Sequence, residues 1–309
     1  MCSTPVMKCS LCDEEAVYVH KVDNKAFCSK HFIRFVERKI NSTINKYNMV
    51  REGDKVAVAL SGGKDSMITL HLLNRYCKRR RIQIFAVMVD EGISGYREKI
   101  IDDVKDYCRR KEIPLYVYSF RKEFGYTLPE MLDKIDAHPC SVCAVLKRWL
   151  INKKSRELGA TRLATGHNLD DEAQSFLMNV FRGDILLSSR LGPVTGVLSE
   201  KKFVRRIKPL YFIPEDAVGL YSKLIKLPVL YDTCPLRKGA YRLDVMHVLN
   251  EFERKHPDVK YKIVKGFLDI LPILKNEYIS SRTLNYCKKC GEPSVGEVCM
   301  ACQILEKLS

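Results

Sequence analysis

The chain has 309 residues, and its 53 lysines and arginines outnumber 37 acidic residues to give a net charge of +16. This length allows one substantial domain with smaller attachments, and the charge favours a polyanionic partner, for which nucleic acid is the leading candidate. No apolar run reaches the roughly 18 residues that a membrane span needs, and the first residues lack the apolar stretch of a secretory signal. We therefore expect a cytoplasmic protein with no membrane segment.

Cysteines near the N-terminus have the spacing of a structural zinc site. Three thiolates and an imidazole suit tetrahedral Zn²⁺, and thirteen cysteines in a compartment that keeps thiols reduced favour metal sites over disulfides. The four candidate ligands are Cys9, Cys12, Cys28 and His31. We assign residues 1–48 to a zinc module and a linking helix, which is expected over Phe32 to Tyr47.

An apolar segment that ends at Leu60 is followed by a polar turn with two glycines and then by the apolar-periodic run Met67 to Leu73. A strand, a turn and a helix start in this order leave free backbone N–H groups and a helix dipole that favour an anion, of which phosphate is the expected one. The candidate phosphate contacts are Ser61, Gly62, Gly63, Lys64, Asp65 and Ser66. Their spacing is not that of the Walker loop. The simpler alternative is a tight turn with a solvated lysine.

Strands and helices then alternate at the spacing of an α/β fold with a doubly wound parallel sheet. The expected strands are Val56–Leu60, Ile84–Val89, Leu115–Ser119 and Arg162–Thr165. The expected helices are Met67–Arg75, Glu98–Arg110, Cys143–Leu158, Asp170–Phe181, Glu215–Leu224 and Glu251–Leu274, with extended segments at 191–193 and 203–211. We assign residues 49–280 to this central domain, whose ligands should bind beyond the carboxyl ends of the strands.

Two further strand ends carry polar or flexible residues. The candidate contacts of a nucleotide at these ends are Val89, Asp90, Gly166, His167 and Asp171. Asp171 is a candidate Mg²⁺ ligand, because this hard cation prefers carboxylate oxygen. Asp170 could simply cap the helix that begins there, and His167 could be a structural hydrogen-bonding residue.

A third set of cysteines fits no complete zinc site. Cys140 and Cys143 precede a basic helix, and Cys234 is distant in sequence. Three thiolates can hold a [4Fe–4S] cluster by three irons and leave the fourth iron open, where sulfur could bind. Two alternatives stay open: a redox-active cysteine pair with an unrelated Cys234, and persulfide chemistry on the same three thiolates.

The C-terminal residues 281–309 contain a second zinc-type pattern of four thiolates. Its candidate ligands are Cys287, Cys290, Cys299 and Cys302. Cys2, Cys77 and Cys108 have no such partners, and Cys77 and Cys108 are expected to be small core residues.

Taken in order, these motifs resemble those of the tRNA 2-thiouridine synthetases of archaea, bacteria and eukaryotic cytosol. The resemblance implies an ATP-pyrophosphatase (adenine nucleotide alpha hydrolase-like) fold and an enzyme, a tRNA uridine 2-sulfurtransferase. In this reaction ATP and Mg²⁺ would adenylate uridine O2, with Lys64, Asp65 and Asp171 serving that step. The three residues Cys140, Cys143 and Cys234 would ligate the cluster and Lys147 would lie near it.

The same resemblance implies that sulfur comes from a thiocarboxylated ubiquitin-like carrier or from free sulfide, and that the protein is a homodimer. The modified uridine would be that of the wobble position 34 or of position 54 in the TΨC loop. Two other classes remain compatible with the residues. One is a related tRNA-binding ATP-pyrophosphatase, such as a lysidine synthetase or an amidotransferase, and the other is a zinc-bearing RNA-binding protein without activity.

Overall fold

The computed structural model describes residues 7–195, 202–237, 239–281 and 285–308, and its centre is a six-stranded sheet. The strands lie in the order β5-β4-β3-β6-β8-β7. The first five run parallel, whereas β7 pairs antiparallel with β8 at the edge. The strands are β3 (Lys55–Leu60), β4 (Gln83–Asp90), β5 (Leu115–Ser119), β6 (Arg162–Ala164), β7 (Val194–Thr195) and β8 (Arg205–Ile207). This confirms the predicted α/β fold with a mostly parallel sheet.

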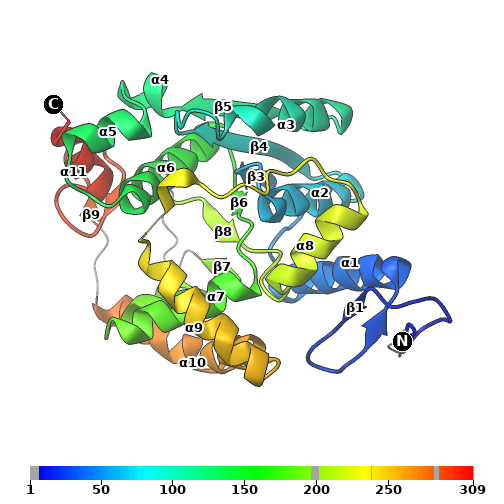
Figure 1. The fold of residues 1–309 in the computed structure, drawn as a ribbon. Coiled ribbons are helices and arrows are strands. Elements are labelled where there is room, and N and C mark those ends of the chain that lie inside the picture. Colours follow the sequence, from blue (N-terminus) through cyan, green and yellow to red (C-terminus); the bar gives the residue numbers. More distant parts are fainter. Residues whose placement is uncertain (1–6, 196–201, 238, 282–284, 309) are drawn as a thin grey trace.

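Helices cover both faces of the sheet (Figure 1). Because side chains of a strand alternate between its faces, Ala86 and Met88 of β4 pack into one apolar cluster, and Phe85 and Val87 pack into another. The helices on the first face are α1 (Ser29–Lys46), α2 (Lys64–Lys78), α3 (Glu98–Arg110) and α8 (Glu215–Leu224). The opposite face is covered by α6 (Pro139–Glu157). The result is a three-layer arrangement.

The helix α6 begins four residues before the predicted start at Cys143. Pro139 occupies its first turn, where a missing N–H costs nothing, and the His138 side chain accepts a hydrogen bond from Cys140 N at 3.2 Å. Cys140 therefore lies in the first helical turn and not before the helix, and Cys143 lies at the start of the second turn. Two short helices that the sequence analysis did not predict come before α6, namely α4 (Phe120–Phe124) and α5 (Leu128–Lys134).

A third group of helices lies beside β7 and β8 (Figure 1). Its members are α7 (Leu169–Phe181), the 3-10 helix η1 (Ile185–Arg190), α9 (Tyr241–Lys255) and α10 (Val259–Ser281). The predicted continuous helix Glu251–Leu274 is wrong, because the chain breaks between α9 and α10 at Pro257. Proline lacks the N–H for a helical hydrogen bond and disfavours helical geometry in the preceding residue.

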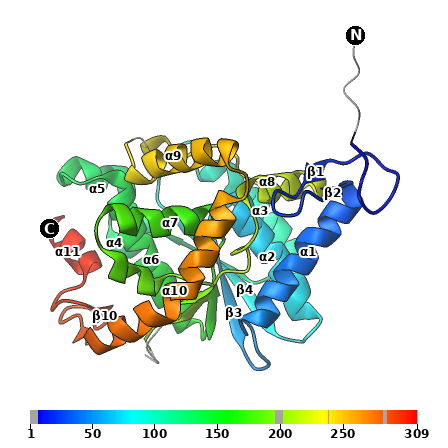
Figure 2. The same ribbon diagram turned by 90° about the horizontal axis from the view of Figure 1, so that it is seen from below.

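Two small modules lie at opposite ends of the molecule (Figures 1 and 2). The N-terminal module is a hairpin of β1 (Tyr18–Val19) and β2 (Ala26–Phe27), which leads into α1. The C-terminal module contains β9 (Asn285–Tyr286), β10 (Pro293–Ser294) and α11 (Met300–Glu306). The apolar side of α1 belongs to the central core, so this linking helix packs on the sheet domain. None of the described helices is both long and apolar enough to cross a membrane.

Candidate functional site

The predicted phosphate loop lies between β3 and α2, with Gly63 as the N-cap residue of α2. Ser66 Oγ accepts a hydrogen bond from Ser61 N at 3.1 Å and donates one to the Gly63 carbonyl at 3.0 Å. These bonds hold the turn closed around the start of the helix. The amino end of α2 carries the positive end of the helix dipole, which is the arrangement that binds phosphate.

Two glycines permit the close approaches that shape this loop. Gly62 has a φ of 77°, and a Cβ atom at this position would lie 2.7 Å from Ile100 Cγ2. Gly166, at the end of β6, is packed so closely on the first turn of α2 that an added Cβ would lie 2.8 Å from both Asp65 C and Ser66 N. The two motifs that the sequence placed about a hundred residues apart are therefore in direct contact.

Lys64 and Asp65 are connected to three different elements. Lys64 Nζ lies 3.2 Å from Asp65 Oδ2 and 2.8 Å from Glu215 Oε1, at the start of α8. Although burial opposes its charge, the Asp65 and Glu215 carboxylates raise the pKa of Lys64. The other oxygen of Asp65 accepts a hydrogen bond from Asn168 Nδ2 at 2.9 Å. This network fixes one cation and one carboxylate beside the phosphate loop.

The helix α7 begins with a reciprocal cap made by Asn168 and Asp171. Asn168 Oδ1 accepts from Asp171 N at 3.0 Å, and Asp171 Oδ2 accepts from Asn168 N at 3.2 Å. Asp170 does not cap this helix, contrary to the alternative considered from sequence. It is buried, accepts from Glu215 N at 2.8 Å and forms an ion pair with Lys260, so it joins α7 to α8 and α10.

Asp171 and His167 flank the same edge of the sheet. Burial raises the pKa of Asp171 to about 6, although Arg242 lies 3.4 Å from its Oδ1 and favours the charged form. His167 Nδ1 lies 2.8 Å from Thr165 Oγ1. Desolvation by the surrounding protein and, as a smaller cause, the positive charge of Lys208 hold the pKa of His167 well below its usual value. The imidazole is therefore neutral near pH 7.

Val89 and Asp90 lie at the carboxyl end of β4, as predicted. The Val89 side chain is buried in the core, so only its main chain is available to a ligand. Asp90 Oδ1 accepts a hydrogen bond from Gly92 N at 2.9 Å and shapes the loop that follows. The neighbouring carboxylate, Glu91, is buried and lies against Arg97 and Lys147.

The third cysteine set comes together beside this edge. Leu230 N donates to the Gly62 carbonyl at 2.8 Å, which lays the segment before Cys234 along the phosphate loop. In the next turn, the 3-10 helix η2 (Pro235–Arg237), the Leu236 carbonyl lies 4.0 Å from Cys140 Sγ. Cys143 and Cys234 both pack against the same apolar cluster. The tertiary structure thus brings the predicted set to the amino end of α6.

The surroundings of these thiols fit an anionic multi-metal group. Within the described residues, two quartets converge to within 4.8 Å as a single ion requires, and this set is not one of them. The amino end of α6 and the cations Arg97, Lys147 and Arg237 lie near the thiols and favour negative charge there, while the Glu91 carboxylate opposes it. Burial is nevertheless the first cause acting on the free thiols and raises the pKa of Cys143 to about 11. Three spread, part-buried thiols in a cationic setting match a cluster better than one metal ion.

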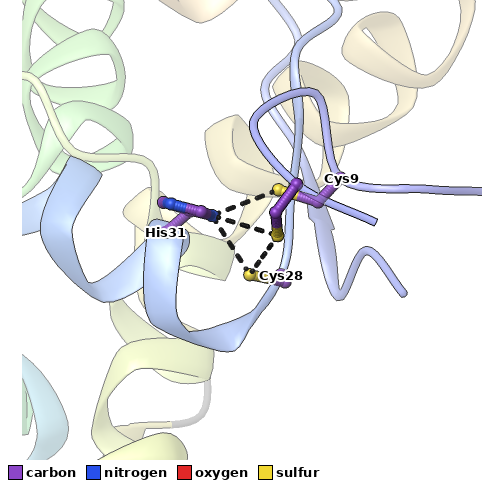
Figure 3. A group of neighbouring side chains, drawn as sticks. Cys9, Cys28 and His31 are labelled. Atoms are coloured by element: carbon purple, nitrogen blue, oxygen red, sulfur yellow. Dashed lines mark hydrogen bonds between the residues drawn. The ribbon is translucent and has the colours of Figure 1, made fainter. Parts of the chain in front are cut away.

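The N-terminal quartet Cys9, Cys12, Cys28 and His31 converges as predicted, and Figure 3 shows Cys9, Cys28 and His31 pointing toward one another. His31 Nδ1 lies 3.5 Å from the Cys9 sulfur, 3.4 Å from that of Cys12 and 3.3 Å from that of Cys28. Burial opposes ionisation of Cys9, but hydrogen bonds from Cys28 N, Leu11 N and His31 outweigh it and lower the pKa to about 6. This donor set fits a closed tetrahedral Zn²⁺ site.

The C-terminal quartet converges in the same way. Its members are Cys287, Cys290, Cys299 and Cys302. Three of these cysteines belong to the apolar cluster that also contains Leu146 and Leu150 of α6. Arg156, near the end of α6, donates to Glu292 at 2.8 Å and fastens the module further. The C-terminal module therefore packs against the helix that carries Cys140 and Cys143.

Known proteins resemble this chain over nearly its whole length. Residues 34–234 match the PP-loop domain model. A tRNA-5-methyluridine(54) 2-sulfurtransferase of Pyrococcus horikoshii is 34% identical over 96% of this chain and 93% of its own. The tRNA 2-thiolation protein NcsA of Haloferax volcanii is 32% identical over 98% and 99%. This chain belongs to the PP-loop family of tRNA thiolation proteins.

A solved member of this PP-loop family has the same fold. The U34-tRNA thiolase NcsA from Methanococcus maripaludis, with its [4Fe–4S] cluster, matches with a TM-score of 0.82 at 34% identity over 99% of this chain and 98% of that one. These matches confirm the predicted family, the α/β fold and the assignment to a class of sulfur-transferring enzymes.

Several polar residues at the site of this PP-loop protein were missed by sequence reasoning. They are Arg97, Asn168, Glu215 and Arg242, which contact Ser61, Asp65, Lys64 and Asp171 respectively. Each belongs to a helix start or a loop whose local pattern is ordinary. Only Asn168 carried a usable signal, since an asparagine three residues before an aspartate at a helix start is typical of a capping box.

Proposed function

We propose that this chain is a tRNA uridine 2-sulfurtransferase that activates O2 of a uridine with ATP and then replaces that oxygen with sulfur. The observation that carries the proposal is the meeting of a phosphate loop with three cysteines. The loop carbonyl of Gly62 is bonded to Leu230, and the chain reaches Cys234 four residues later. This contact supports a nucleotide-activating site that would lie next to a sulfur-handling site.

The first step uses the phosphate loop. Uridine O2 attacks the α-phosphate of ATP, a new O–P bond forms, the bond between the α- and β-phosphates breaks, and pyrophosphate leaves. The amino end of α2 and Lys64 would stabilise the negative charge that develops. Asp171 would hold Mg²⁺ against the phosphates, and Asp65 would orient Lys64, from which it lies 3.2 Å.

The second step uses the cysteine site. AMP is now a good leaving group at C2, so a sulfur nucleophile can form the C2–S bond while the C2–O bond breaks. A [4Fe–4S] cluster on Cys140, Cys143 and Cys234 would supply an open iron that binds sulfide and presents it to C2. Lys147 lies one helical turn beyond Cys143 on α6, where its ammonium would favour the departing AMP.

The partners follow from charge and chemistry. A net charge of +16 favours tRNA as the substrate, and its target uridine must be unpaired or flipped out to reach C2. The two quartets would hold structural Zn²⁺ in closed shells and serve folding and RNA docking. Sulfur would come from a thiocarboxylated ubiquitin-like carrier or from free sulfide. The protein would act as a homodimer in the cytoplasm.

The proposal includes both uridine 34 and uridine 54, because identity does not separate the two classes. The relative named for uridine 54 and the solved structure named for uridine 34 are each 34% identical to this chain. Mass spectrometry of tRNA from a deletion strain would identify the position that loses its sulfur.

The cysteine variants test the proposal most directly. Anaerobically prepared protein should hold one [4Fe–4S] cluster, with brown colour and matching iron content. Alanine at Cys140, Cys143 or Cys234 should abolish colour and tRNA thiolation. Alanine at Cys108, a buried thiol of α3, is the matched control and should keep the iron.

Two outcomes would contradict this function. Unchanged iron content in all three ligand variants would remove the cluster from the site. A colourless wild-type protein that releases pyrophosphate with tRNA but transfers no sulfur would indicate another ATP-dependent tRNA modification.

A further inference from the structure

Glu91 is a buried carboxylate held between two cations. It follows β4, and Arg97 precedes α3; their side chains are 2% and 5% exposed. Arg97 Nε lies 3.0 Å from Glu91 Oε2, and its terminal nitrogen lies 3.0 Å from Oε1, so the pair is bidentate. Lys147 Nζ donates to Glu91 Oε1 as well. The Glu91 carbonyl accepts from Leu128 N at 2.8 Å, which fixes its main chain.

The stability of the fold does not by itself account for this arrangement. Two cations share one carboxylate out of water, and a buried ion pair is often no better for stability than apolar residues of the same volume. Burial opposes the charge of Glu91, but Lys147 and Arg97 outweigh it and lower its pKa to about 2. The carboxylate is therefore ionised whenever the protein is folded near neutral pH, and it keeps its two partners in place.

Arg97 extends the network to the phosphate loop. Besides its two bonds to Glu91, it donates to the main-chain carbonyl of Ser61. Ser61 is itself bonded to Ser66 in the first turn of α2. A continuous chain of hydrogen bonds thus runs from Lys147, on the helix of Cys143, to the turn that would hold the ATP phosphates.

Lys147 gains a fixed position from this contact. A lysine side chain has four flexible bonds and loses rotamer entropy when it is held. Within the residues that the structure describes, Glu91 is the acceptor that contacts its ammonium, and the side chain is 25% exposed. Glu91 thus engages the ammonium while the side chain stays partly accessible.

We propose that Glu91 and Arg97 are positioning residues that hold the Lys147 ammonium between the cysteine site and the phosphate loop. The consequence for turnover rests on the proposed function, in which Lys147 acts on the activated uridine. The contact itself does not, and the two can be tested separately.

Amine labelling tests the contact without any turnover. Full-length protein is treated with acetic anhydride at fixed pH, and the acetylation rates of Lys147 and Lys154 are read by peptide mass spectrometry. Lys154 lies on the same helix and is ion-paired to Glu123 at 3.0 Å, so it is an internal reference. In Glu91→Gln, Lys147 should react about tenfold faster, the effect of losing one hydrogen bond to a charged group, while Lys154 is unchanged.

The matched control is Glu123→Gln. It should speed the labelling of Lys154 and leave that of Lys147 at the wild-type rate. If Lys147 reacts at the wild-type rate in Glu91→Gln, the positioning contact is absent and the proposal is overturned.

Thiolation kinetics test the consequence. Glu91→Gln should lower kcat by about tenfold or more, with iron content and the KM for ATP unchanged, and Glu91→Asp should recover part of the rate because it keeps the charge. Arg97→Lys keeps a charge but loses the fork that reaches both partners, so it should also raise the KM for ATP. Faster Lys147 labelling with wild-type kcat in Glu91→Gln would overturn the positioning role. A wild-type protein that thiolates no tRNA would defeat the proposed function, while the labelling still decides the contact.

Discussion

The contact between Gly166 and the first turn of α2 leaves no room for one added methyl group. A Cβ atom there would lie 2.8 Å from Asp65 C and 2.8 Å from Ser66 N. Both are main-chain atoms, so the strand end or the helix start has to move. Overpacking of this kind costs about 1–3 kcal/mol, and each kcal/mol lowers the melting temperature by about 2–4 °C for a large domain. Gly166→Ala should therefore melt at lower temperature.

The same substitution should weaken ATP binding, because the displaced turn carries the N–H groups that would face the phosphates in the proposed function. We expect about a tenfold loss of affinity, which is about 1.4 kcal/mol, in calorimetric titration with ATP. Gly219→Ala is the matched control. Gly219 lies inside α8 with no atom within 4 Å of an added Cβ, so alanine should stabilise the fold by about 0.5–1 kcal/mol. Wild-type stability and ATP affinity in Gly166→Ala would refute this reasoning.

Three other predictions follow from the site. Lys64→Ala and Asp65→Ala should keep the iron and the tRNA affinity but lose ATP-dependent pyrophosphate release; wild-type turnover in either would remove that residue from the mechanism. Replacing Cys287 and Cys290 by serine should lower iron content and tRNA affinity, because their module packs on α6, while ATP still binds. A normal thiolation rate in this variant would show that the module is not needed for tRNA docking. Burial opposes the charge of Glu91, yet its cationic neighbours lower its pKa from 4.5 to about 2. The contribution of this carboxylate to the free energy of unfolding is therefore at most about 3 kcal/mol. It is complete above pH 4.5 and is lost as the pH falls toward 2. Urea denaturation should show the stability gap between wild type and Glu91→Gln narrowing over that window, and a constant gap would contradict the assignment.

Local sequence was sufficient where a function depends on neighbouring residues. The zinc-type quartets were predicted because two-residue spacing lets one turn aim two sulfurs at one ion, and both quartets converge in the structure. The phosphate loop was predicted because a strand, a glycine turn and a helix start form a phosphate site within about ten residues. The helix α3 and the strand β5 have the predicted bounds, since their apolar periodicity is uninterrupted.

Sequence reasoning failed where one residue changes the local geometry. Pro257 separates α9 from α10 within a charged stretch, Arg254 to Asp258, inside the segment that was predicted as one helix. Pro139 has the opposite effect, because proline is tolerated at the start of a helix, and α6 therefore includes Cys140, which was expected to precede it.

The chain by itself determined the chemical groups, their local spacing and the family to which they belong. Only the tertiary structure decided which groups meet. The hydrogen bond between Leu230 and Gly62 brings Cys234 to the site, and the contact of Lys147 with Glu91 joins α6 to the loop after β4, 56 residues earlier. Such contacts depend on how helices pack across a parallel sheet, and neither periodicity nor spacing along the chain records the distance between segments that lie far apart in sequence.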